Sequence, residues 1–247
     1  TGVQTCALPI FYDSLPNAEI MHQGYYSVVP YVIPGCYVAY AFSYTGGALI
    51  EWCLKQLAPQ VIEQAAREGI SPNALLERAY ISEYGDKPSG LLVLPHFAGA
   101  ATPYMDAGSR GAILGLTTDT DIATIYRACL EGVAYEMLLN MRALSGSGVH
   151  FNAIRATGGG ARSSVWMQMK ADILDVPMIA VKTVDAGTVG SAMLTGIATG
   201  LFRDLNDAAD HMVEIAECFT PRQDKHDAYM RVYERYAHVY EAVRPLM

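Results

Sequence analysis

The sequence predicts an α/β fold with a mixed sheet flanked by helices, and three features of the 247-residue chain predict it. A strand–helix–strand–helix succession extends from residue 152 to residue 200. A long amphipathic helix is expected over 121–145, and three glycines, Gly158 to Gly160, separate a predicted strand from a predicted helix. Alternating strands and helices are typical of a partly parallel sheet, because parallel neighbours need a crossover connection between them.

The first part of the chain is expected to form short strands followed by helices. Residues 24–45 are rich in Tyr and Val, with prolines only between the apolar runs, which favours two or three strands. From Gly46 to Leu57 the apolar residues recur at helical spacing, and Pro59 is expected to end that helix. The remaining elements predicted here are helices over 60–68 and 72–81, a buried strand over 91–97 and a loop over 98–111.

The helix predicted over 121–145 has the clearest pattern in the sequence. Its apolar residues recur every three or four positions, acidic residues occur at its start, and Gly146 stands just beyond its end. The elements predicted after it are strand 152–157, helix 162–174, strand 178–181, helix 187–200 and a last helix over 222–244. No internal repeat or low-complexity linker separates these elements, so we expect one α/β domain.

Composition limits the classes of partner. The net charge is −8 and the isoelectric point is near 5.2. A protein that binds nucleic acid or an anionic membrane surface needs a surplus of basic residues to neutralise phosphates, and this chain has none. A small anionic ligand remains compatible with the charge, because helix ends and backbone N–H groups can hold it locally.

Cysteine usage and hydropathy favour a protein of the reducing cytoplasm. The five cysteines are scattered and form no C-x-x-C pair, which argues against a disulfide framework or a zinc site. The uncharged run over 186–202 has 17 residues and many Gly, Ser and Thr. A membrane helix needs about 20 apolar residues, so we expect a buried, closely packed helix there.

The first ten residues, TGVQTCALPI, lack the basic and apolar regions of a signal peptide. They resemble a translated sequencing adapter, so we expect residues 1–10 to be a non-native scar. In that case Cys6 is no part of the biology and the natural protein extends upstream. A genuine amino-terminal strand is the alternative.

The glycine cluster can form a tight turn or hold a phosphate, since glycine lets a ligand approach the backbone and a helix N-terminus favours anions. A P-loop is excluded, because no G-x-x-x-x-G-K-[ST] string occurs. A dinucleotide-binding fingerprint is disfavoured by Ser163 at its sixth position and by the late position of Asp185, the nearest acid. The strand, glycines and helix are similar to the adenosine motif of actin-like ATPases.

Three further stretches accompany the glycine cluster. The four together are YTGGALIEW (44–52), TPYMDAGSRGAILGL (102–116), TGGGARSSVWMQMKADIL (157–174) and DAGTVGSAMLTGIATG (185–200). In this order and approximate spacing they resemble the carboxyl-terminal half of the FGGY family of carbohydrate kinases, in particular its xylulokinase-like branch. The resemblance implies a ribonuclease-H-like, actin-like ATPase fold and makes residues 11–247 the nucleotide-binding domain.

The resemblance also implies contacts for the glycine cluster and the helix after it. Gly159 and Gly160 match the glycines whose N–H groups approach the α-phosphate of ATP, with a structural turn as the alternative. Ser163 or Ser164 would contact the adenine or ribose. A serine in the first turn is equally a helix N-cap, so both roles stay open.

A second group of residues is implied near the terminal phosphates. Gly46 and Gly47 would line the cleft there, and Glu51, one helical turn onward, would face the nucleotide; a plain strand-to-helix turn is the alternative. Asp106 and Arg110 are spaced so that they can pair and hold their loop near this cleft.

The family resemblance implies an ATP-dependent kinase that uses Mg²⁺ and phosphorylates a small ketose or polyol, with xylulose as the first expectation. The sugar contacts and the aspartate that acts as general base belong to the family's amino-terminal half, so we expect no catalytic residue and no metal ligand in this chain and no activity from it alone. A homodimer is compatible with the family. The alternatives are a free-standing actin-like nucleotide-binding or regulatory domain and, more weakly, a Rossmann-type oxidoreductase.

Overall fold

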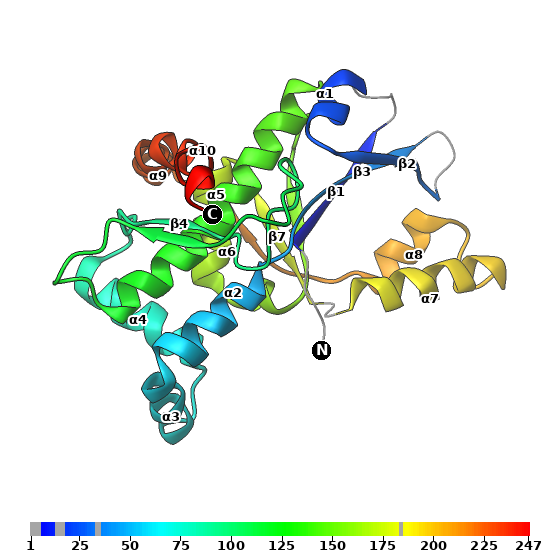
Figure 1. Ribbon diagram of the computed structural model, residues 1–247. Coiled ribbons are helices and arrows are strands. Elements are labelled where there is room, and N and C mark those ends of the chain that lie inside the picture. Colours follow the sequence, from blue (N-terminus) through cyan, green and yellow to red (C-terminus); the bar gives the residue numbers. More distant parts are fainter. Residues whose placement is uncertain (1–5, 13–17, 33–35, 183–184) are drawn as a thin grey trace. The chain divides into compact units, whose positions relative to one another are not determined.

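The computed structural model describes residues 6–12, 18–32, 36–182 and 185–247 (Figure 1). The chain divides into two compact units, the first comprising residues 1–150 and 223–247 and the second comprising residues 151–222. The sequence predicts one domain, because no linker composition marks the points where the chain leaves and re-enters the first unit. Each unit is described by itself.

The first unit begins with a three-stranded antiparallel sheet of β1 (Cys6–Tyr12), β2 (Ser27–Pro30) and β3 (Tyr37–Ser43), in the order β1-β3-β2. The short helix α1 (Ala18–Gln23) lies between β1 and β2 in the sequence. The strands predicted over 24–45 are confirmed as two, β2 and β3. Part of the expected scar, residues 1–5, lies outside the described residues, and the scar stays a prediction.

Helices follow, as the sequence predicts. Helix α2 (Gly47–Trp52) continues into a π-helical turn over Cys53–Leu57. Pro59 does more than end this segment, because it is the first residue of α3 (Pro59–Glu68), where its missing N–H leaves no bond unmade. Helix α4 (Pro72–Tyr84) begins in the same way after Ser71, whose hydroxyl accepts a hydrogen bond from the Ala74 amide at 3.1 Å.

The buried strand expected over 91–97 is confirmed in shorter form as β4 (Leu92–Leu94), which pairs with β5 (Ala112–Leu114) in antiparallel register. Strand β5 was not predicted from the sequence, because three residues are too few to show alternation. The loop predicted over 98–111 joins the two strands and is confirmed in position.

Helix α5 (Ile122–Gly146) is the core of the first unit and confirms the helix predicted over 121–145. The Asp121 carboxylate caps it by accepting a hydrogen bond from the Thr124 amide at 2.7 Å. Every residue from 126 to 136 is buried, so α5 is covered on all sides there. The predicted final helix is broken into α9 (Gln223–Tyr236) and α10 (Val239–Val243), followed by a 3-10 turn over Arg244–Leu246.

The second unit has the mixed sheet that the sequence predicts, in the order β6-β7-β8. Strands β6 (Ile154–Ala156) and β7 (Met178–Val181) are parallel, and α6 (Ser164–Leu174) forms the crossover between them. Strand β8 (Ile215–Phe219) pairs antiparallel with β7. Sequence analysis missed β8, whose residues are mostly exposed and do not alternate, and also α8 (Leu205–Met212).

Helix α7 (Ala186–Ala198) differs from the buried, closely packed helix expected from its small residues. Of its residues only Met193 and Gly196 are buried. It packs against α8, and the Phe202 ring fills the space beside Gly196. Within the described part of the chain, no helix is both long enough and apolar enough to cross a membrane.

Candidate functional site

The first group of predicted site residues lies at the start of α2 in the first unit. Gly46 is the N-cap position and Gly47 the first helical residue, and the Leu49 amide donates to the Gly46 carbonyl at 3.2 Å. Helix α2 is anchored at its other end, where the Trp52 ring lies 4.6 Å from that of Phe97. The predicted strand-to-helix turn is therefore present at Gly46 and Gly47, held on a packed helix.

Glu51 is exposed and forms an ion pair with Lys55 one turn later on the same helical segment, with Oε1 2.6 Å from Nζ. The hydrogen bond from the Lys55 ammonium lowers the pKa of the Glu51 carboxyl. Because the pair is solvent-exposed, it contributes little to stability. Its contact with a nucleotide stays a prediction.

Asp106 and Arg110, which the sequence predicts as a pair, each have other partners. The Asp106 carboxylate accepts hydrogen bonds from the Tyr240 hydroxyl at 2.8 Å and from the Gly108 amide at 2.9 Å. The Arg110 guanidinium donates to three carbonyl oxygens of its own loop, those of residues 107, 108 and 109. Both residues therefore hold the loop in shape, by contacts different from those predicted.

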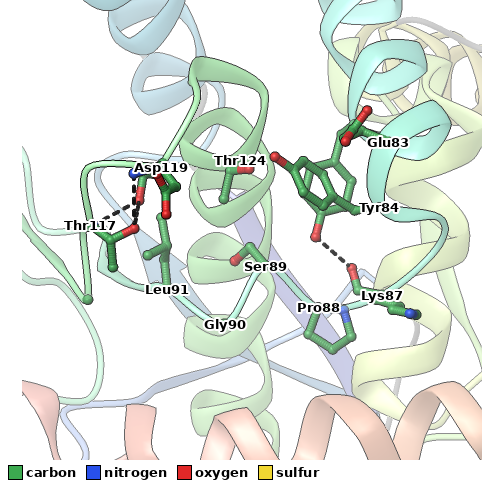
Figure 2. A pocket seen from close by; sticks show the side chains of 13 residues that line it. Glu83, Tyr84, Lys87, Pro88, Ser89, Gly90, Leu91, Thr117, Asp119 and Thr124 are labelled. Carbon is green, nitrogen blue, oxygen red and sulfur yellow. Dashed lines mark hydrogen bonds between the residues drawn. The ribbon is translucent and has the colours of Figure 1, made fainter.

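A surface depression of about 540 Å³ lies in the first unit (Figure 2). It is lined by the end of α4, the segment before β4, the segment after β5 and the start of α5. Figure 2 shows Tyr84 and Lys87 on one side, Thr117 and Asp119 on the other, and Thr124 between them. Gly46, Gly47 and Glu51 are not among the residues that line it. This depression is therefore separate from the predicted nucleotide contacts in the same unit.

Sequence reasoning missed a buried polar cluster around His96. The His96 ring nitrogens lie 2.8 Å from the Ser109 hydroxyl and 3.2 Å from Glu136 Oε1. The Tyr236 hydroxyl donates to the other Glu136 oxygen at 2.6 Å. All four side chains are buried. The cluster ties the loop between β4 and β5 to α5 and α9, and it has no exposed face at which a substrate could react.

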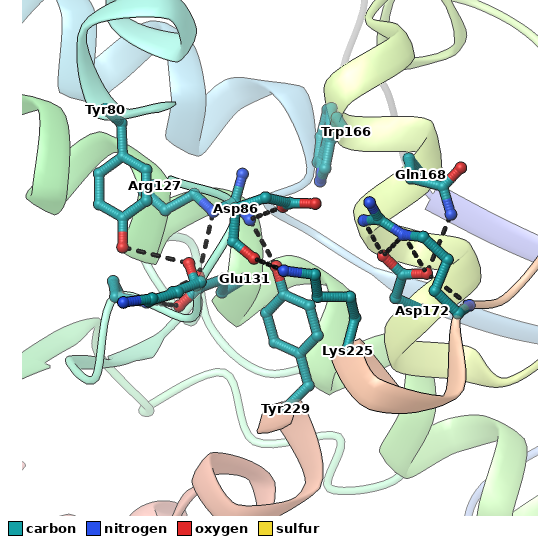
Figure 3. Close-up of polar contacts among 12 residues, drawn as sticks. Tyr80, Asp86, Arg127, Glu131, Trp166, Gln168, Asp172, Lys225 and Tyr229 are labelled. Atoms are coloured by element: carbon teal, nitrogen blue, oxygen red, sulfur yellow. Dashed lines mark hydrogen bonds and ion pairs between the residues drawn. The ribbon is translucent and has the colours of Figure 1, made fainter. Parts of the chain in front are cut away.

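A second buried cluster surrounds Arg127 on α5 (Figure 3). The Arg127 guanidinium donates to Glu131 Oε1 at 3.2 Å and to Asp86 Oδ1 at 3.2 Å. Glu131 is fully buried, and its Oε1 also accepts a hydrogen bond from the Ser89 amide at 2.9 Å. Burial raises the pKa of the Glu131 carboxyl, and the charge of Arg127 opposes that shift. The cluster fixes the segment between α4 and β4 on α5.

The second group of predicted site residues forms the turn between β6 and α6. Gly158 has φ +83°, a left-handed conformation that glycine adopts without strain. A 3-10 turn over Gly159–Arg162 follows, and α6 begins after Ser163. The arrangement is a strand, a glycine turn and a helix N-terminus, whose N–H groups and dipole suit an anion.

The two serines at the start of α6 have different partners. Ser163 is the N-cap, because its hydroxyl accepts a hydrogen bond from the Trp166 amide at 3.0 Å. The Ser164 hydroxyl donates to Glu217 Oε2 on β8 at 3.3 Å. The capping role that the sequence offers for Ser163 is therefore present. Contacts of either serine with adenine or ribose remain predictions.

Gly160 lies against the face of Trp166. A Cβ atom on residue 160 would be 2.9 Å from Trp166 Cζ3 and 3.5 Å from Lys170 Nζ. The Lys170 ammonium itself lies 3.9 Å from the centre of the Trp166 ring, and both side chains are buried. A larger residue at 160 would displace Trp166, so glycine is required at this position by packing within the unit as well as by any ligand.

Helix α6 is also held at its far end (Figure 3). The buried Asp172 carboxylate accepts hydrogen bonds from the Arg222 amide at 2.9 Å, from Arg222 Nε at 3.2 Å and from Gln168 Nε2 at 2.9 Å. The glycine turn therefore leads into α6, a helix fixed at both ends.

Asp185, expected to brace the following helix, is the N-cap of α7. Its carboxylate accepts a hydrogen bond from the Thr188 amide at 3.0 Å.

Among the residues that the structure describes, no three His, Cys, Asp or Glu side chains are grouped so that they could hold a metal ion. The glycine turn fits a phosphate better than a bare cation, since its main-chain donors are N–H groups.

The predicted site residues form two groups, one in each unit.

Comparison with known proteins identifies the family. Residues 8–199 match the model of the C-terminal domain of the FGGY family of carbohydrate kinases. The chain is 28% identical over 214 residues to a xylulose kinase of Staphylococcus epidermidis, covering 87% of this chain and 41% of that protein. It is 31% identical over 186 residues to a glycerol kinase of Deinococcus radiodurans, covering 74% of this chain and 34% of that one.

Solved structures agree with the family match. A crystal structure of a xylulose kinase from Brucella ovis superposes with a TM-score of 0.81 at 26% identity, covering 98% of this chain and 48% of that one. The Plasmodium falciparum glycerol kinase with ADP has a TM-score of 0.67 at 21% identity and shows a likeness of fold. The chain spans less than half the length of these relatives. It belongs to the FGGY family of carbohydrate kinases and corresponds to the C-terminal domain of that family.

Proposed function

We propose that this chain is the ATP-binding part of a kinase that phosphorylates a hydroxyl group of a small ketose or polyol, with xylulose as the first candidate. The observation that carries the proposal is the turn at Gly158–Gly160, which opens directly onto the N-capped helix α6. A bare main chain at a helix N-terminus accommodates phosphate groups without a side chain in the way.

In this proposal the two groups of glycines contact different parts of the nucleotide. The N–H groups at Gly159 and Gly160 approach the α-phosphate, and Ser163 and Ser164 lie beside the adenosine. Gly46 and Gly47 line the path of the terminal phosphates, and Glu51 faces the nucleotide. The proposed fold type is the ribonuclease-H-like fold of actin-like ATPases. The fold that this chain shares with solved xylulose and glycerol kinases supports this proposal.

Phosphoryl transfer depends mainly on positioning and charge stabilisation. This chain supplies main-chain donors and a helix N-terminus, which hold and orient the nucleotide. Mg²⁺ would neutralise phosphate charge, held chiefly by phosphate oxygens and water, because it retains several water ligands in such sites. The general base is an aspartate of the amino-terminal half of such kinases, which is not among these 247 residues.

The substrate class follows from the relatives. One relative is named a xylulose kinase, and xylulose is a ketose. Another is named a glycerol kinase, and glycerol is a polyol. We infer a substrate of this size, bound by the amino-terminal half, in a cytoplasmic protein. Self-association into a homodimer is part of the proposal and is measured by sedimentation.

The first prediction concerns binding without turnover. The purified 247-residue chain should bind ATP and ADP in a calorimetric titration and should not bind NAD⁺, because the turn lacks the dinucleotide fingerprint. It should release no ADP when xylulose or glycerol is added with Mg²⁺-ATP, because the base is absent. Binding of NAD⁺ in preference to ATP would refute the assignment of ATP as the nucleotide. Sugar-dependent ADP release would refute the proposal that the general base lies outside these 247 residues.

A further inference from the structure

The surface depression of the first unit has no part in the proposed function. Its volume of about 540 Å³ is that of a cleft for a small molecule. Hydrogen bonds hold several of its lining groups in place. The Tyr84 hydroxyl donates to Asp121 Oδ2 at 3.0 Å, and the Thr117 amide donates to Thr120 Oγ1 at 2.9 Å. The lining is therefore fixed by the protein itself.

Three charged residues line the depression, and their charged groups are available to a ligand. Figure 2 shows Glu83 and Lys87 on the side of α4 and Asp119 on the opposite side. All three residues are exposed. Within the described part of the chain, their side chains take part in no hydrogen bond or ion pair. The two carboxylates and the ammonium can therefore bind a ligand without first giving up a contact seen in this structure.

The signs of these charges limit the class of ligand. Two carboxylates and one ammonium leave a net charge of −1, and the Asp121 carboxylate beside Tyr84 adds to it. This charge repels a nucleotide or a sugar phosphate, and the Lys87 ammonium repels a bare cation. A neutral ligand with several hydroxyl groups satisfies both signs, because each hydroxyl can donate to a carboxylate and accept from an ammonium.

The rest of the lining also suits a hydroxylated ligand. The Tyr84 side chain is 37% exposed, so part of its ring is open to the C–H groups of a ligand. The buried Tyr80 ring, 5.0 Å away between centres, supports it from the protein side. Gly90 and Gly115 are exposed and have no side chain, which leaves main-chain groups within reach of ligand hydroxyls.

We propose that this depression binds a small uncharged sugar or polyol. The Glu83 and Asp119 carboxylates accept hydrogen bonds from its hydroxyl groups on opposite sides, Lys87 donates to them, and the Tyr84 ring packs against its C–H groups. The unphosphorylated substrate of a sugar kinase belongs to this class of ligand, whereas its phosphorylated product does not. The inference goes beyond the proposed function and does not depend on where the nucleotide binds.

The test is a titration of the isotope-labelled 247-residue chain with xylulose, followed by amide chemical shifts. We expect saturable shifts at residues 83–91 and 115–124, with a dissociation constant of roughly 1–10 mM, as is usual for a ligand of this size with few contacts. Xylulose 5-phosphate, which carries the opposed charge, should bind several-fold more weakly.

Three alanine variants complete the test. Glu83→Ala and Asp119→Ala each remove one carboxylate from the lining, and each should weaken xylulose binding about fivefold, the effect of losing a hydrogen bond to a charged group. Glu63→Ala on α3 removes an exposed carboxylate outside the depression and should leave the affinity unchanged. The melting temperature of each variant is the folding control.

The absence of saturable shifts at residues 83–91 and 115–124 would overturn the inference, and so would shifts confined to other residues. Equal losses in Glu63→Ala and Asp119→Ala would reduce the effect to general charge. Binding of xylulose 5-phosphate as tight as that of xylulose would contradict the class of ligand. Each of these results leaves ATP binding untouched, and a failure of the chain to bind ATP would leave this site standing.

Discussion

Replacing Arg127 with Met is expected to lower the free energy of unfolding by about 3–5 kcal/mol, the usual effect of removing one partner of a buried ion pair. Glu131 is fully buried and loses its cation in this variant. The hydrogen bonds from Ser89 remain, but they do not supply a positive charge. Urea-induced unfolding followed by circular dichroism measures the change.

The Arg127→Met variant should also become sensitive to pH. Burial already raises the pKa of Glu131 above its ordinary value, and Arg127 opposes that rise. Without Arg127 the pKa rises further, so the folded state binds the Glu131 proton more tightly than the unfolded state. The contribution of Glu131 to the stability of the variant should therefore be fully present below the ordinary carboxyl pKa of about 4.3 and be lost as the pH rises above it.

A double variant separates this explanation from lost packing. Arg127→Met combined with Glu131→Gln removes both charges, and should recover part of the lost stability and abolish the added pH dependence. Equal instability of the single and double variants at pH 8, with no difference in pH dependence, would contradict the assignment of a buried ion pair.

Gly132→Val is expected to destabilise the first unit by about 3 kcal/mol or more, the upper range for overpacked cores. A Cβ atom at residue 132 would lie only 2.3 Å from the Val93 carbonyl oxygen, so α5 must move away from β4. The neighbouring residues of α5 are buried on all sides, and this leaves the helix no free direction in which to shift. The measurement is again the free energy of unfolding in urea.

Gly146 on the same helix provides the matched control. A Cβ atom there would meet nothing within 4 Å, and Gly146 does not require a left-handed backbone. Gly146→Ala should therefore be neutral or stabilising by up to about 1 kcal/mol, the helix-propensity difference. Gly132→Ala, which adds only that Cβ atom, should be clearly more destabilising than Gly146→Ala. Equal effects of these two alanine variants would show that α5 does not approach β4 as closely as described.

The long and periodic elements could be predicted from the sequence. Helix α5 shows its apolar spacing over many turns, and the succession β6, α6, β7, α7 shows alternating strands and helices. Strands β5 and β8 could not, because one is three residues long and the other is mostly exposed, so neither has a pattern of its own. The exposure of α7 could not be predicted either. Its small residues indicate close packing, but they do not indicate which other element the helix packs against.

The glycine turn of the candidate site could be predicted because its determinants are consecutive in the sequence. The clusters around His96 and Arg127 could not, since all their partners except Glu131, which is four residues from Arg127, come from segments far apart in the chain. The stack of Trp166 and Lys170 is local, at helical spacing, but its contact with Gly160 depends on how the turn folds back. Spacing alone does not give that direction.

The central claim is that an adenine nucleotide rests on the main chain at residues 158–160. It is tested most directly by amide chemical-shift mapping of the isotope-labelled chain during titration with ADP. We predict that the largest saturable shifts fall on the amides of Gly158 to Ser164. If ADP saturates the chain while those amides stay unchanged, and the largest shifts fall elsewhere, for example at the surface depression around Tyr84 and Thr117, the claim is contradicted.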